Sequence, residues 1–136
     1  MDWKLELVVV PVADVDRAKT FYMDIAGFDL LVDHSEGEFR VVQLTPHGSS
    51  CSIAIMSNPE AAGSLHGLHL VVCDIEAART ELVERKFEPS EVFHFEAGNQ
   101  VPGFDPEGRD YNSFFAFNDP DGNSWLVQEV KARAAS

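Results

Sequence analysis

One pattern of residues occurs twice in the 136-residue chain, at an offset of 60 positions. A β-rich run ends at Val12, Asp14 follows where a helix N-cap belongs, and apolar residues at helical spacing come next. Val72 and Asp74 take the same places in the second half. Because the order of the expected elements also matches, the sequence predicts two copies of one supersecondary unit.

The first half is predicted to run β-α-β-β-β. Leu5 to Val12 has the composition of a strand, the residues after Asp14 follow helical spacing, and Gly27 suits the helix C-cap. Runs of turn composition separate three further expected strands, at residues 28–32, 39–44 and 52–56.

The second half is predicted to repeat this order. A strand over residues 68–74 leads into a helix that begins at Ile75. Residues 119–123, Asp-Pro-Asp-Gly-Asn, form a tight turn, because Pro fixes φ and Gly and Asn tolerate left-handed backbone. This turn is expected to close a hairpin between the last two strands. The strands that follow the helix are expected at residues 87–93, 114–117 and 124–130.

Residues 94–111 have no counterpart in the first half and no periodicity. A loop of this length in a compact domain usually serves in binding, or else it is disordered. Phe95, Phe104 and Tyr111 offer apolar anchors, which favour an ordered cover over a pocket. His94 and Glu96, at the start of the loop, are candidates to face that pocket.

These patterns predict an α+β protein. Residues 1–58 are expected to form the first βαβββ module, residues 59–65 a linker, and residues 66–136 the second module, with its long loop at 94–111. The two modules together are expected to make one structural domain, since 136 residues suit a single core.

The net charge of −13 limits the choice of partners. Ten Lys and Arg against 23 Asp and Glu argue against nucleic acid or an anionic membrane as partner. The same charge favours a cationic ligand, or serves solubility alone.

The sequence predicts a cytoplasmic protein. It contains no run of 18 apolar residues and no signal-peptide pattern at its start. Its two cysteines, Cys51 and Cys73, give neither a disulfide framework nor metal-ligand spacing.

Two stretches carry a resemblance to a known family. The strand-to-helix turn around Val12-Ala13-Asp14-Val15, with Phe21-Tyr22 and Gly27-Phe28 further on, is similar to the opening of the vicinal oxygen chelate superfamily. The Asp119–Asn123 turn before an aromatic strand is similar to the end of that family's second module. The family includes glyoxalase I, extradiol dioxygenases and bleomycin-resistance proteins.

The resemblance implies a curled mixed sheet around a cavity for a small organic molecule. A cavity of this kind is mostly apolar, with a few polar groups. It also implies a homodimer, since family members commonly form one.

The family's usual metal site has no donor side chains here. Metal-dependent members place their ligands on the inner face of four strands, and the corresponding positions in this chain are Leu7, Ala54, Gly67 and Leu126. Because a divalent site needs imidazole, carboxylate or thiolate donors, we expect no cofactor. The alternative is a shifted site, in which His66, Glu129 and one further donor hold Zn, Ni, Fe or Mn after a bulge changes the register.

A few polar residues remain as candidates for the site. Strand alternation places His69 on the face of Gly67, where it would act as an acid–base catalyst or bond a ligand, or else would be a satisfied core histidine. Arg109 would bind a ligand carboxylate, or else pair with a neighbouring acid at the surface. The predicted ligand-binding set is Leu7, Val9, Ser52, Ala54, Gly67, His69, Arg109, Tyr111, Leu126 and Gln128.

Two functions of different class follow from the sequence. The first is a glyoxalase/bleomycin-resistance-like protein that binds, and sequesters, a drug or metabolite without a metal. The second is a lyase, isomerase or dioxygenase of the same superfamily, with a shifted metal or with His69 as acid–base.

Overall fold

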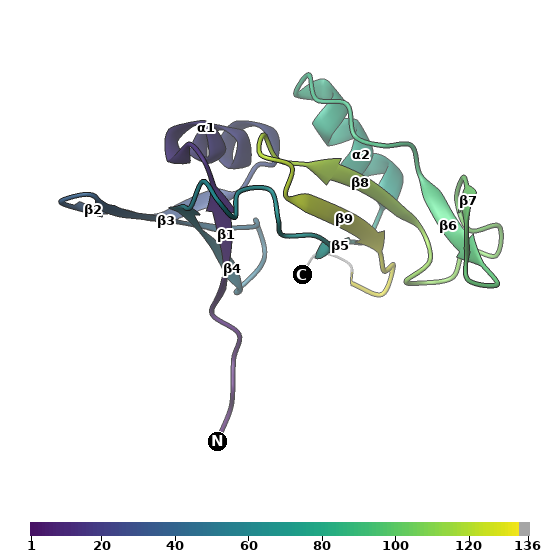
Figure 1. Cartoon of the computed structure of the whole chain (residues 1–136). Coiled ribbons are helices and arrows are strands. Elements are labelled where there is room, and N and C mark those ends of the chain that lie inside the picture. Colours follow the sequence, from purple (N-terminus) through teal and green to yellow (C-terminus); the bar gives the residue numbers. More distant parts are fainter. Residues whose placement is uncertain (134–136) are drawn as a thin grey trace. The chain divides into compact units, whose positions relative to one another are not determined.

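The computed structural model describes residues 1–133 and divides into two compact units, each with one sheet and its own helix (Figure 1). The first unit comprises Met1–Leu65 and Asp119–Asn123, and the second comprises His66–Asn118 and the residues from Ser124 onward. Both sheets are mixed, and both stay open at their edges. The predicted α+β class with two βαβββ repeats is therefore confirmed, with one additional strand in the second unit.

The first unit contains a four-stranded sheet in the order β1-β4-β3-β2. The parallel pair is β1 (Leu7–Val12) with β4 (Ser52–Ser57), while β3 (Phe39–Thr45) runs antiparallel to β4 and to β2 (Asp29–Glu36). A parallel pair requires a crossover connection, which begins here with α1 (Val15–Thr20) and the π-helical turn η1 (Phe21–Ile25).

The second unit contains a five-stranded sheet in the order β5-β9-β8-β6-β7. Its parallel pair is β5 with β9, and the predicted hairpin of β8 with β9 is confirmed, with Phe117 opposite Trp125. The elements are β5 (Leu68–Val72), α2 (Ile75–Glu84), β6 (Phe93–Glu96), β7 (Asn99–Pro102), β8 (Phe114–Asn118) and β9 (Ser124–Glu129).

Both predicted helix caps are confirmed. The Asp14 carboxylate accepts a hydrogen bond from the Arg17 amide at 3.0 Å, and the Asp74 carboxylate accepts one from the Ala77 amide at 3.0 Å. Each bond satisfies one of the amides that a helix start leaves without a partner. Within residues 1–133, no helix is long and apolar enough to cross a membrane.

The strand predicted over residues 87–93 is wrong except at Phe93. Pro89 has no amide hydrogen to donate, and Ser90 supplies the local contact with β8 instead. The Ser90 amide donates to the Ala116 carbonyl at 2.9 Å, and the Ser90 hydroxyl accepts from the Ala116 amide at 2.8 Å. This segment therefore lies against β8 without continuing the ladder.

The prediction of a loop from residue 94 is wrong for residues 94–102. Phe93–Glu96 and Asn99–Pro102 pair as an antiparallel hairpin. Ala97 and Gly98 form its two-residue turn with φ of 51° and 79°, the left-handed backbone that such a turn requires. Ala–Gly is a weaker turn signal than Asn–Gly, and so the sequence pattern did not reveal the hairpin.

A buried carboxylate organises the first unit. Asp119 accepts hydrogen bonds from the Tyr22 hydroxyl and from the Asn123 side-chain amide, both at 2.8 Å. The same Asn123 amide donates to the Pro11 carbonyl at 2.9 Å, and its oxygen accepts from the Leu65 amide at 3.1 Å. The turn of residues 119–123 is thereby fixed to β1, to the helical segment and to the end of residues 59–65.

Gly63 allows the close approach of this turn, and its replacement by Ala should destabilise the protein strongly. Its φ is +81°, and a Cβ at this position would lie 2.2 Å from the Asp121 carbonyl oxygen. We expect the left-handed backbone to cost about 1–2 kcal/mol. The clash of the Cβ with the backbone should lower the free energy of unfolding by about 1–3 kcal/mol more. Urea denaturation measures the total loss.

Gly48→Ala is the matched control. Gly48 has a similar φ of +87°, but nothing lies within 4 Å of the added Cβ. It should therefore show the backbone cost alone. Equal losses in the two variants would contradict the close approach at Gly63.

Candidate functional site

The open face of the first sheet gathers four of the predicted site residues. In the register of β1 and β4, Leu7 lies opposite Ser52 and Val9 lies opposite Ala54. Opposed residues share a face of a sheet, so all four point the same way. Val9 is 49% exposed, whereas Ser52 and Ala54 are buried, with the Ser52 hydroxyl 2.7 Å from the Thr45 hydroxyl.

Three more of the predicted site residues lie on the open face of the second sheet. His69 on β5 lies opposite Leu126 on β9, and Gln128 follows two residues along β9 on the same face. His69 is exposed, while Leu126 and Gln128 are half-buried. Gly67 lies just before β5 with a φ of +78°.

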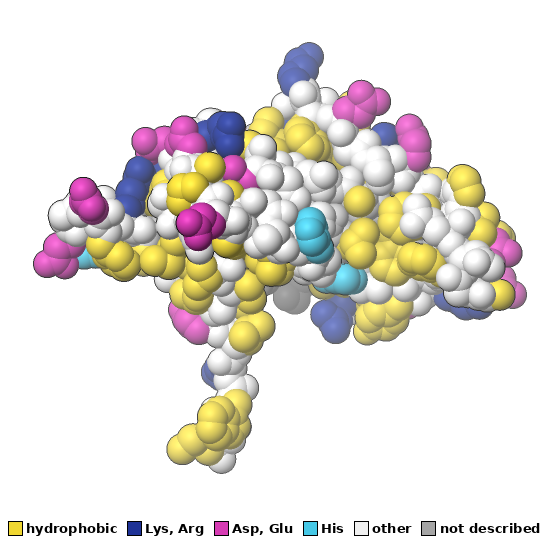
Figure 2. Space-filling model, in the orientation of Figure 1, with side chains coloured by type: hydrophobic (Ala, Val, Ile, Leu, Met, Phe, Trp, Pro, Cys, Tyr) yellow, Lys and Arg dark blue, Asp and Glu magenta, His cyan; other side chains and the backbone are white. Residues whose placement is uncertain are grey.

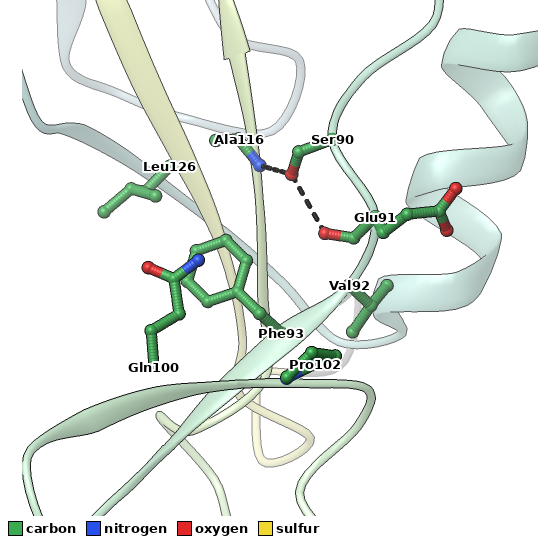
Figure 3. Close-up of a pocket in the computed structure, with 8 residues that line it drawn as sticks. All are labelled: Ser90, Glu91, Val92, Phe93, Gln100, Pro102, Ala116 and Leu126. Atoms are coloured by element: carbon green, nitrogen blue, oxygen red, sulfur yellow. Dashed lines mark hydrogen bonds between the residues drawn. The ribbon is translucent and has the colours of Figure 1, made fainter.

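A pocket of about 530 Å³ opens beside this second group (Figure 3). In Figure 3 the Phe93 ring lies at its centre, with the Gln100 amide and Leu126 around it, and the Glu91 side chain points away toward the helix. Of the predicted site residues only Leu126 lines it. The other lining residues are Ser90, Glu91, Val92, Phe93, Gln100, Pro102 and Ala116.

The sequence interpretation missed these lining residues because it missed the β6–β7 hairpin. The sequence did contain a strand signal for this hairpin. Phe93 and Phe95 on one strand are two residues apart, as are Gln100 and Pro102 on the other, so each pair lies on one face of its strand. The Ala97–Gly98 turn between the two pairs is the point at which the hairpin reverses.

Three phenylalanines form an aromatic cluster next to the pocket. Phe93 and Phe114 stack at a centroid distance of 5.6 Å and an angle of 17°. Phe95 meets both edge-on, at 5.9 Å from Phe93 and 5.5 Å from Phe114. Phe95 remains 39% exposed, so the cluster presents an aromatic surface to solvent.

Arg109 is already engaged in ion pairs. Its guanidinium lies 2.8 Å from the Asp105 carboxylate and 3.2 Å from that of Glu107. The hydrogen bond from Arg109 lowers the pKa of Asp105 well below its usual range, and the backbone amides of Glu107 and Arg109 also donate to this carboxylate. Arg109 thus holds the loop after β7 in shape.

Tyr111 and Gln128 meet through the backbone. Tyr111 is 55% exposed and has a φ of +69°, which is uncommon for a residue with a side chain. Its carbonyl accepts from the Gln128 side-chain amide at 3.1 Å, and its amide donates to the Glu129 carbonyl at 2.8 Å.

His94 is buried and lies between two acceptors. Its Nε2 is 2.5 Å from the Glu96 carboxylate, and its Nδ1 is 2.7 Å from the Gly103 carbonyl. The Glu96 hydrogen bond, and then the Gly103 carbonyl, raise the pKa of His94 above its ordinary value. The imidazole therefore connects β6 to Gly103, just after β7.

The residues at the family's usual ligand positions do not fit a divalent metal. Leu7, Ala54, Gly67 and Leu126 occupy the positions of the family's ligands and offer no donor side chain. Over residues 1–133, no three His, Cys, Asp or Glu side chains gather where they would hold an ion.

The two named donors of the shifted metal site each have another partner. The His66 imidazole lies 3.2 Å from the Ser124 hydroxyl. The buried Glu129 carboxylate accepts from the Ile75 amide at 2.9 Å, on the face that carries the helix.

The chain belongs to the Glyoxalase/Bleomycin resistance protein/Dioxygenase superfamily, whose family model matches residues 4–127. The resemblance noted in the sequence is therefore confirmed. Among curated proteins, the chain is 27% identical over 127 residues to the uncharacterized protein YetH of Bacillus subtilis (strain 168), covering 90% of this chain and 94% of YetH.

Solved structures with the same fold include two proteins from Streptomyces sp. CB03234. TnmS3, an antibiotic binding protein, is 30% identical with a TM-score of 0.72, over 94% of this chain and 96% of TnmS3. A glyoxalase/bleomycin resistance protein is 31% identical with a TM-score of 0.69, over 93% of this chain and all (100%) of that one.

The His94 contacts predict that their contribution to stability falls with rising pH. Because the folded-state pKa is raised, this contribution is fully present below the ordinary value of 6.5 and is lost as pH rises through the folded-state value. We expect His94→Gln to lower the free energy of unfolding at pH 6. The difference in free energy of unfolding between variant and wild type should narrow toward pH 9. Urea denaturation measures both values.

His47→Gln is the control for a His→Gln change at the surface, since the His47 side chain is 88% exposed. Its difference from wild type in free energy of unfolding should stay small. A gap for His94→Gln that is constant, or widens with pH, would disprove the charged contact.

Proposed function

We propose that this protein binds a small organic molecule, of the antibiotic type, against the open face of its second sheet and without a metal. The observation that carries the proposal is the pocket of about 530 Å³ on the second sheet. Its volume is in the range of small-molecule sites, and its lining combines apolar side chains with neutral polar groups such as the Gln100 amide.

Two further observations support this proposal. TnmS3, with 30% identity over 94% of this chain, is an antibiotic binding protein. The exposed aromatic surface of Phe95 suits a flat ligand, and the net charge of −13 favours one that carries a positive group. On this proposal Leu126, Gln128 and His69 contact the ligand from the second sheet.

We further propose that the protein is a cytoplasmic homodimer. Large apolar side chains remain exposed on the N-terminal segment and on the first sheet, and a second copy would cover them (Figure 2). Trp3 is 89%, Leu5 69% and Val9 49% exposed. On the first sheet, Leu7, Val9, Ser52 and Ala54 are the ligand-facing residues that the family resemblance implies. Two free thiols, Cys51 and Cys73, suit a reducing compartment.

A catalytic role for His69 is the second candidate function. Its Nδ1 lies 2.6 Å from the Gly67 carbonyl, an arrangement that orients an imidazole for general-base work through Nε2. A lyase, isomerase or dioxygenase reaction would require turnover of a substrate, and it should be lost in His69→Ala. Turnover that survives this substitution would exclude the role.

Binding can be tested with two antibiotics, bleomycin and the cationic polycyclic compound doxorubicin. We expect at least one to raise the melting temperature and to change the tryptophan fluorescence of the protein. Leu126→Arg should weaken that binding by tenfold or more, since it places a cation in the pocket wall. Thermal denaturation measures the melting temperature, and titration followed by fluorescence measures the affinity of each variant.

Val83→Arg is the matched control, because Val83 is 45% exposed on α2 and does not line the pocket. It should bind like the wild type. No stabilisation by either antibiotic would contradict the proposed ligand type, and equal losses in both variants would contradict the proposed position.

A further inference from the structure

Two polar side chains on the open face of the second sheet are each held by a backbone carbonyl. His69 Nδ1 lies 2.6 Å from the Gly67 carbonyl oxygen. The Gln128 side-chain nitrogen lies 3.1 Å from the Tyr111 carbonyl oxygen.

These contacts fix what each side chain offers to a ligand. A carbonyl oxygen only accepts hydrogen bonds, so the atom that faces it must carry the hydrogen. Nδ1 of a neutral His69 is therefore the protonated nitrogen, and Nε2 is an acceptor. In the same way the Gln128 NH₂ group faces Tyr111, and Oε1 is left as the acceptor.

Both orienting carbonyls belong to residues in left-handed backbone, which glycine adopts readily and tyrosine rarely does. Gly67 has a φ of +78° and Tyr111 a φ of +69°. Tyr111 is anchored there by its amide, which donates to the Glu129 carbonyl at 2.8 Å. Left-handed backbone at a residue with a side chain persists only where its surroundings impose it, and it often marks a functional site.

Both acceptors flank a residue of the pocket. His69 is directly opposite Leu126, which lines the pocket, and Gln128 is two residues beyond Leu126 on the same face. Diagonal neighbours of this kind are about 7–8 Å apart, a span that one aromatic ligand covers. Within residues 1–133, no hydrogen bond engages His69 Nε2 or Gln128 Oε1.

We infer that His69 Nε2 and Gln128 Oε1 determine specificity, by selecting aromatic ligands that carry O–H or N–H donors. A ligand with a hydroxyl or amine at its edge satisfies an acceptor while its ring packs against Leu126. An ether at the same place leaves the acceptor without a partner once the ligand has displaced water. This inference rests on the proposed small-molecule function and names the ligand chemistry of that site.

The test compares two probes that differ in one hydrogen-bond donor, 2-naphthol and 2-methoxynaphthalene. At pH 8 we expect 2-naphthol to bind about threefold to tenfold more tightly, the range for one neutral hydrogen bond. His69→Leu or Gln128→Leu should reduce this preference, and the double variant should abolish it. Titration calorimetry measures the ratio of dissociation constants.

Val71→Leu is the matched control, because Val71 lies on the same face of β5, is 42% exposed and carries no hydrogen-bonding group. It should keep the wild-type preference. Circular dichroism confirms that each variant is folded.

The outcomes separate this inference from the proposed function. If 2-naphthol shows no preference, or does not bind, while doxorubicin or bleomycin binds, the inference about the acceptors is overturned and the binding function stands. A preference that survives in the double variant also overturns it. If none of the four compounds binds, both are overturned.

Discussion

The buried carboxylate of Asp119 is the interaction on which the rest of the first unit depends. A buried charge without partners costs several kcal/mol, so each of its oxygens must receive donors. The Tyr22 hydroxyl, the Asn123 side chain and the amides of Asp121 and Asn123 supply them. The Asp-Pro-Asp-Gly-Asn stretch therefore does more than reverse the chain. Asp119 accepts hydrogen bonds from the helical segment and from the turn itself, and Asn123 donates one to β1.

The parts of the fold that the sequence predicts correctly have local causes. Asp14 and Asp74 cap their helices through amides three residues ahead, and the turn at residues 119–123 joins adjacent strands. The hairpin of residues 93–102 was missed because Ala97 takes left-handed backbone without a typical turn residue. The strand expected over 87–93 failed for a similar local reason, since Pro89 interrupts the ladder.

The candidate site was predictable only where strand parity determines it. Alternation alone places Leu126 and Gln128 on one face, and the register of β5 adds His69 to them. Alternation gives no information about the partners of Arg109, whose ion pair with Asp105 depends on the shape of an irregular loop. The pocket wall at Phe93 and Gln100 could not be predicted from the sequence for another reason. It forms only when β6 and β7 pair.

The Tyr22–Asp119 hydrogen bond joins residues 97 positions apart, within one compact unit. During synthesis Tyr22 leaves the ribosome long before the turn that completes its surroundings. Residues 1–65 must therefore wait, with part of their core open, until the β8–β9 hairpin has been made, and closing so long a loop is slow. We therefore expect the first unit to be exposed to chaperones and to misfolding during synthesis, although its strands and helix are synthesised first.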